Sequence, residues 1–142
     1  MRLIIEARLE AENTDATATP TEAMIVAVVE RQDRSVADLG LTLAEGRTLL
    51  AEVQSVLVAQ QAAAWLADKA ACRRCGTALA HKDTRSIVVR TVFGKVDVPS
   101  PRLWTCSCAS KRGQPRHSVS PLCKAVPRRV TPELEYLQAK WA

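Results

Sequence analysis

Five cysteines in a chain of 142 residues are the side chains with the most distinctive chemistry in this sequence. Two of them form Cys72-Arg-Arg-Cys75, followed by a glycine, and two more form Cys106-Ser-Cys108 further along the chain. Thiolates at this close spacing grip one metal ion, and four of them close the tetrahedron of a structural zinc site, which keeps no open position for catalysis. The pattern predicts a zinc ribbon with four ligands, Cys72, Cys75, Cys106 and Cys108.

The segment between the two cysteine pairs has to bring the second pair back to the first. Residues 86–93 alternate and are rich in β-branched side chains, and Gly94-Lys95 follows with the composition of a two-residue type II′ turn. This predicts a β-hairpin that pairs Phe93 with Val96. In that register Cys106 lies across from about Asp83, near the chain that returns from the first pair.

Other assignments of the cysteines stay open. The gap between the pairs is longer, and the second pair tighter, than in common zinc sites. The reserve ligands are His81, His117 and Cys123, although such residues are more often ordinary polar or core residues. A thiol oxidoreductase is a further alternative, because the arginines after Cys72 would lower thiol pKa values. However, redox motifs of this kind open a helix, and this one follows a predicted helix.

Charge is distributed unevenly along the chain, whose formal net charge is +5. Residues 1–71 carry a net charge of −5 and residues 72–142 a net charge of +10, and all five cysteines lie in the basic half. This asymmetry predicts a polyanionic partner, most simply nucleic acid, with a solvated basic surface as the alternative. Trp104 either covers the metal site or stacks on a base. The predicted DNA-binding residues are Arg73, Arg74, Arg102, Lys111, Arg112, Arg116, Arg128 and Arg129, which can hold phosphates.

The acidic half has its own elements. Residues 1–10 alternate as in a half-buried strand, and residues 23–30 favour a second strand, hairpinned to the first, over a short helix. Thr42 and Glu45 form a capping box. Apolar residues then recur at three- and four-residue steps and predict a helix from 43 to about 69. Its apolar stripe is expected to pack on the strands, with a homodimer through this helix as the alternative.

The sequence therefore predicts an α+β fold in three parts. Residues 1–71 form an acidic strand pair and long helix, and residues 72–130 form a basic zinc-ribbon-like domain. Thr131-Pro132-Glu133 begins a C-terminal helix in residues 131–142, which ends with its apolar stripe still running and is expected to be truncated. Charges in the first ten residues argue against a signal peptide, and no apolar run is long enough for a membrane span. We expect a cytoplasmic protein with no membrane partner.

Several motifs along the chain occur in a familiar order. After the long helix come Cys-x-x-Cys-Gly at 72–76, Arg-Thr-Val-Phe-Gly-Lys-Val at 90–96 and Trp-x-Cys-x-Cys at 104–108. With the stretch from Ser118 to Thr131-Pro-Glu-Leu, and Leu-Gly-Leu-Thr-Leu-Ala-Glu-Gly at 39–46, this order resembles the N-terminal part of ISKra-type insertion-sequence transposases. In that family the region precedes a ribonuclease-H-like catalytic domain whose acidic residues hold magnesium. The resemblance implies a DNA-binding fragment that takes part in transposition and binds transposon ends.

Catalysis is not expected of this chain. The acidic residues after Cys72 are only Asp83, Asp97, Glu133 and Glu135, placed in the hairpin and the terminal helix. Two-metal strand transfer needs clustered carboxylates. We therefore predict a zinc-ribbon DNA-binding fragment of a transposase that is not itself an enzyme because the catalytic acidic cluster is missing. The alternative function is a zinc-ribbon module for protein–protein interaction without DNA binding.

Overall fold

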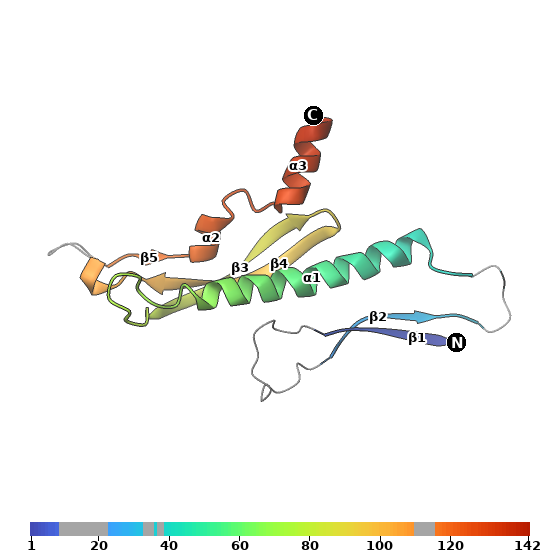
Figure 1. The fold of residues 1–142 in the computed structure, drawn as a ribbon, viewed down its shortest axis with the longest axis horizontal. Helices are drawn as coiled ribbons and strands as arrows, with labels where there is room; N and C mark the ends of the chain where they lie inside the picture. The colour runs from blue at the N-terminus through green and yellow to red at the C-terminus, as the bar shows by residue number, and fades with distance from the viewer. Residues whose placement is uncertain (9–22, 33–35, 37–38, 110–115) are drawn as a thin grey trace. The chain divides into compact units, whose positions relative to one another are not determined.

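The computed structural model describes residues 1–8, 23–32, 36, 39–109 and 116–142. In chain order the elements are β1 (Arg2–Ala7), β2 (Met24–Glu30), α1 (Leu43–Ala67), β3 (His81–Thr91), β4 (Gly94–Trp104), the short 3₁₀ helix η1 (Ser107–Ala109), β5 (Ser118–Val119), α2 (Pro121–Ala125) and α3 (Pro132–Trp141) (Figure 1). This confirms the α+β class, with a strand pair, a long helix and a C-terminal helix. The chain divides into two compact units, Met1–Val53 and Gln54–Ala142.

The first unit contains a two-stranded antiparallel sheet. Leu3 of β1 pairs with Val29 of β2, and Ile5 pairs with Ala27 before the register shifts between Ile5 and the next residue. The predicted strand hairpin is therefore confirmed, and residues 23–30 are extended rather than helical. β-Branched residues favour this choice because their side chains fit a pleated surface better than a helix. Residues 9 and 10 of the predicted first strand lie outside the described residues.

The predicted capping box starts α1. The backbone N–H of Thr42 donates to Glu45 Oε2 at 2.8 Å, and the backbone N–H of Glu45 donates to Thr42 Oγ1 at 3.2 Å. The same carboxylate also accepts hydrogen bonds from both terminal nitrogens of Arg31, at 2.6 and 2.8 Å. Arg31 follows β2 directly, so this bidentate pair ties the end of the strand to the start of the helix.

These contacts predict an unusually acidic carboxyl group. Hydrogen bonds from the Arg31 side chain, and then from the Thr42 backbone and hydroxyl groups, lower the pKa of Glu45 from 4.5 to about 2. Because this pKa is lowered in the folded state, the carboxylate stabilises the first unit above pH 4.5, and the contribution is lost as pH falls toward 2. We expect a carboxyl NMR titration to find the low pKa in the native chain and a higher value in Arg31→Gln, still below 4.5 because the hydrogen bonds from Thr42 remain.

The control for that titration is Arg47→Gln, which removes an exposed arginine from the same end of the helix. This variant is expected to leave the pKa of Glu45 low. An unchanged pKa in Arg31→Gln would contradict the bidentate pair.

The second unit contains a three-stranded antiparallel sheet in the order β3-β4-β5. β3 and β4 form a long hairpin whose inner face is apolar, and Ile87 pairs with Val98 while Val89 pairs with Val96. All four side chains are buried, together with Leu122 of α2. Alternation along both strands therefore puts one face of the hairpin into the core.

The turn of this hairpin lies two residues earlier than predicted. The structure pairs Thr91 with Gly94, so that Val92-Phe93 forms the turn and the predicted pairing of Phe93 with Val96 is wrong. Thr91 Oγ1 accepts the backbone N–H of Phe93 at 3.2 Å and donates to the carbonyl of Gly94 at 3.0 Å, and Gly94 takes a φ of +144°. The predicted register would have set Ile87 against Arg102, whereas the observed one sets it against Val98.

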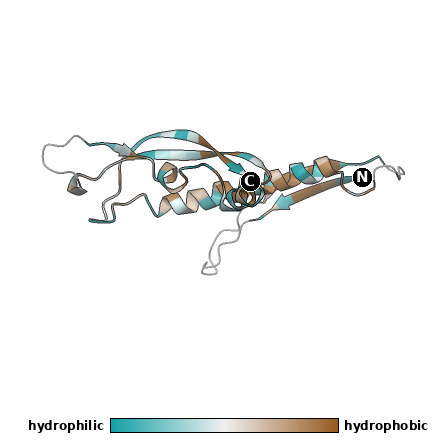
Figure 2. Cartoon of the chain, turned by 90° about the horizontal axis from the view of Figure 1, so that it is seen from above, coloured by the Kyte–Doolittle hydropathy of each residue, from teal (hydrophilic) through white to brown (hydrophobic). Residues whose placement is uncertain are grey.

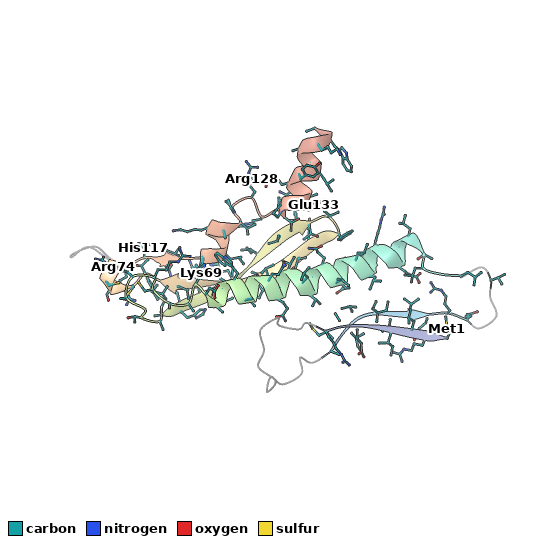
Figure 3. The ribbon with its side chains drawn as sticks, in the orientation of Figure 1. Met1, Lys69, Arg74, His117, Arg128 and Glu133 are labelled. Carbon is teal, nitrogen blue, oxygen red and sulfur yellow. The ribbon has the colours of Figure 1, made fainter. Side chains whose placement is uncertain are left out.

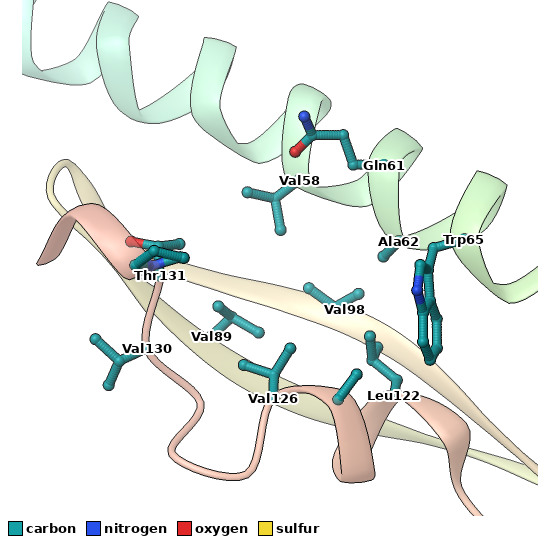
Figure 4. A pocket seen from close by; sticks show the side chains of 12 residues that line it. Val58, Gln61, Ala62, Trp65, Val89, Val98, Leu122, Val126, Val130 and Thr131 are labelled. Carbon is teal, nitrogen blue, oxygen red and sulfur yellow. The ribbon is translucent and has the colours of Figure 1, made fainter. Parts of the chain in front are cut away.

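The C-terminal half of α1 completes the core of the second unit. Val58, Ala62, Trp65 and Leu66 are partly buried against the hairpin and α2. A hollow of about 280 Å³ remains between these elements and the start of α3 (Figure 4). The boundary between the two units therefore lies within α1. The predicted boundary at 71/72 followed the change in charge.

Both apolar and polar residues occur along α1 (Figure 2). Only part of the predicted stripe contributes to the core, because Leu50, Val53 and Leu57 each keep at least 40% of their surface exposed. The homodimer through this helix stays a prediction.

The segment after η1 contains more regular structure than the sequence indicated. β5 lies in this segment, and its Val119 pairs with Leu103 of β4. α2 follows, and its N-cap Ser120 accepts the backbone N–H of Cys123 at 3.3 Å. α3 begins as predicted after Thr131, but the threonine side chain makes no capping bond, and its backbone N–H donates to the carbonyl of Arg90 at 2.9 Å.

No helix among the described residues combines the length and the apolar character that crossing a bilayer requires.

Candidate metal centre

The first cysteine pair lies in a tight loop between α1 and β3. The backbone N–H of Gly76 donates to the carbonyl of Cys72, and the N–H of Cys72 donates to the carbonyl of Thr77, both at 2.8 Å. Gly76 takes a φ of +73°, a conformation that favours glycine. The loop therefore folds back on itself and turns the thiols at Cys72 and Cys75 to the same side.

The second cysteine pair follows β4 directly. The backbone N–H of Trp104 donates to the carbonyl of Ala80 at 2.8 Å, which holds the end of β4 beside the chain that leaves the first pair. Cys106 directly precedes η1, and Cys108 lies within it. Because Asp83 pairs with Arg102, the prediction that Cys106 lies opposite Asp83 is wrong by several residues. The hairpin still returns the second pair to the first.

The four sulfurs form one cluster. The Sγ atoms of Cys72, Cys75, Cys106 and Cys108 all lie within 4.8 Å of one another. Cys75 Sγ lies 3.5 Å from Cys106 Sγ and 3.4 Å from Cys108 Sγ, and Cys72 Sγ lies 3.6 Å from Cys108 Sγ. A zinc–sulfur bond of about 2.3 Å in a tetrahedron requires sulfurs about 3.8 Å apart, so the donor set and its spacing fit a metal ion. A disulfide needs about 2.05 Å, and all five cysteines are free.

Electrostatics differ between the two pairs. The pKa of Cys75 is lowered to about 6, mainly because its sulfur shares a hydrogen bond with the Thr77 hydroxyl. Backbone N–H groups of Arg74 and Cys75 lower the pKa of Cys72. The pKa of Cys108 is raised to about 12, because the sulfurs of Cys75, Cys106 and Cys72 surround it. Four thiolates repel one another at this spacing, and a divalent cation between them reverses that repulsion.

The reserve ligands lie outside this cluster. Among the described residues, the cluster consists of the four cysteines alone. His81 Nε2 shares a hydrogen bond with Thr84 Oγ1 at 2.9 Å, and Cys123 Sγ lies 3.7 Å from Ser100 Oγ in the core. The backbone carbonyl oxygen of His117 accepts hydrogen bonds from the backbone N–H and the hydroxyl group of Thr105. The four residues predicted as the metal site are therefore the four that the fold brings together.

The predicted DNA-binding residues that the structure describes differ in what they contact. Two of them hold the metal loop itself: Arg74 Nη1 donates to the carbonyl of Cys108 at 3.0 Å, and Arg116 Nε donates to the carbonyl of Thr105 at 3.3 Å. Arg73 and Arg129 are exposed. Figure 3 shows Arg74 and His117 at one end of the second unit.

Two further predicted residues are engaged in ion pairs. Arg102 forms a bidentate pair with Asp83, and this guanidinium lowers the pKa of that carboxyl group. Arg128 pairs with Glu135 of α3. Each pairing leaves its arginine less available for a phosphate. Lys111 and Arg112 lie outside the described residues.

Sequence reasoning did not identify the lysine that accompanies Trp104. Lys82 Nζ lies 4.8 Å from the centre of the Trp104 ring and donates to Ser118 Oγ at 3.3 Å. A cation on a tryptophan face is a favourable contact. The two residues lie far apart in sequence, and only the register of β3 and β4 brings them together.

Comparison of the chain with known protein families, with curated proteins and with solved structures finds no significant match.

Proposed function

We propose that this protein is a zinc-ribbon DNA-binding module of an insertion-sequence transposase and holds the DNA of transposon ends. The observation that carries the proposal is the cluster of four cysteine sulfurs within 4.8 Å of one another. Zinc is the metal that four thiolates in a tetrahedron favour, and such a site is structural because every position is taken by protein. The module itself carries out no chemistry on DNA.

The charge around the metal supports DNA as the partner. The chain from residue 72 onward carries a net charge of +10, and Arg73 and Arg74 lie in the metal-binding loop itself. Zinc stiffens this loop, so the exposed guanidinium of Arg73 is presented from a fixed backbone. Contacts of this kind position a protein on the phosphate backbone and do not by themselves read sequence.

Salt dependence tests the DNA-binding function. We expect the affinity of the zinc-loaded chain for a mixed-sequence DNA duplex to fall at least about tenfold between 50 and 200 mM salt, because phosphate contacts release counterions. Fluorescence anisotropy measures the affinity at each salt concentration. Arg73→Gln is expected to reduce the slope of log affinity against log salt by about 1.

A matched control for that slope is Arg2→Gln, which removes an exposed arginine from the acidic half of the chain and is expected to leave the slope unchanged. An affinity that neither salt nor a chelator alters would contradict the proposal. Absence of duplex binding at 50 mM salt would contradict it as well and would favour a module for protein–protein interaction.

A further inference from the structure

A second hollow of the second unit lies directly beside the metal centre. Its volume is about 290 Å³. The walls come from the metal-binding loop, the end of β4, β5 and the start of α2, and most of the lining is apolar: Ala71, Leu79, Leu103, Val119 and Pro121. Trp104 lines it as well, together with the ligand residues Cys72 and Cys106. The hollow is at the small end of the size range of ligand sites.

Cations surround this apolar hollow. Lys69, Arg73 and Lys124 line it, from the turn after α1, the metal-binding loop and α2 respectively, and no acidic residue is among the described residues that line it. Lys82 adds a fourth positive charge on the Trp104 ring. A ligand that complements this hollow has a flat apolar group, which packs on the apolar lining and Trp104. It also carries negative charge, which pairs with the surrounding lysines and arginine.

One unit of a nucleic acid strand has this chemistry. A nucleobase presents a flat π-face that stacks on tryptophan regardless of sequence, and its phosphodiester carries one negative charge on each side of the sugar. In a duplex both faces of a base are covered by neighbouring bases, so only an unpaired base has a face to offer. The hollow, at about 290 Å³, has room for a single base.

The geometry points to a binding site for one unpaired DNA base, stacked on the face of Trp104 that Lys82 does not cover, with the adjacent phosphates held by Lys69, Arg73 and Lys124. This inference rests on the proposed DNA-binding function and adds to it a preference for strands with exposed bases. Such a preference suits DNA ends, where bases at the terminus lose their partners most readily.

The test compares two labelled single strands of equal length and charge, one with bases and one abasic throughout. The full chain is loaded with zinc, and fluorescence anisotropy gives its affinity for each strand. We expect native protein to prefer the strand with bases. Trp104→Leu is expected to weaken binding of that strand by about 5- to 150-fold, the range for loss of one base–aromatic stack, and to leave the abasic strand unaffected. Trp104→Phe keeps an aromatic face and is expected to retain most of the preference.

The matched control is Trp141→Leu, which removes an exposed tryptophan from α3 and is expected to change neither affinity. Zinc content is measured for every variant, because Trp104 is close to Cys106 in the chain. If the leucine variant releases zinc, the affinities of native protein and of Trp104→Phe for the two strands still test the stacking of a base on Trp104.

Equal affinity of native protein for both strands would overturn the inference, as would an equal loss for both strands in zinc-loaded Trp104→Leu. Displacement of the base-containing strand by an acidic peptide but not by free single-stranded DNA would overturn it too. In these cases salt-sensitive binding of duplex DNA would persist, whereas failure of the proposed function removes duplex binding itself.

Discussion

Replacing Cys72 by serine is expected to abolish tight metal binding and to unfold the metal-binding end of the second unit. A hydroxyl is a poor ligand for zinc, and the three remaining sulfurs no longer close the tetrahedron. Structural zinc in small domains is bound with apparent free energies of about 10–16 kcal/mol at pH 7, and this energy stabilises the fold. Elemental analysis after dialysis against a chelator is expected to find about one zinc ion per native chain and none in Cys72→Ser.

The same substitution at Cys123 is the matched control. This fifth cysteine is free like the others, but its sulfur lies beside Ser100 in the core and not in the cluster. Cys123→Ser is therefore expected to keep one zinc ion per chain. Full zinc content in Cys72→Ser, or its loss in Cys123→Ser, would contradict the assignment of the four ligands.

The metal site could be predicted from sequence because its signals are local. Cys72-x-x-Cys75 and Cys106-x-Cys108 each specify a chelating pair by spacing alone, and alternation between the pairs indicates that the chain folds back. Local signals also identified the Thr42–Glu45 capping box, which the structure confirms. In each case the interacting residues lie within a few positions of one another.

The register of the hairpin could not be predicted in the same way. Gly94-Lys95 has the composition of a type II′ turn, but Thr91 Oγ1 makes two hydrogen bonds that hold the turn at Val92-Phe93. The decisive factor is non-local, because the buried pairs Ile87–Val98 and Val89–Val96 form in only one register. The ion pair of Arg102 with Asp83 depends on the same register and was missed for the same reason.

The division into units also depends on packing rather than on local sequence. Charge changes sign near Cys72, but charge describes the surface of a protein. The second half of α1 belongs to the basic unit because Val58, Ala62 and Trp65 pack on its core. These side chains form the same helical stripe as the exposed Leu50 and Val53, so spacing alone does not distinguish the two halves.

The substitution Ile87→Ala is expected to destabilise the second unit by about 2–5 kcal/mol. Ile87 keeps only 4% of its surface exposed and packs in a core of five buried residues. Truncation of its side chain therefore leaves a cavity that few neighbours can fill. All three tryptophans, Trp65, Trp104 and Trp141, lie within Gln54–Ala142, so tryptophan fluorescence during urea unfolding follows this unit alone.

The neighbouring residue on β3 provides the matched control. Val88 follows Ile87 directly but points to the opposite face, with 40% of its surface exposed. Val88→Ala is expected to change the free energy of unfolding by less than about 0.5 kcal/mol. Equal effects of the two substitutions would contradict the register, because a slip of one residue along β3 exchanges its buried and exposed faces. Such a slip would also move the strand end that leads from the first cysteine pair, so the core and the metal site depend on the same alignment.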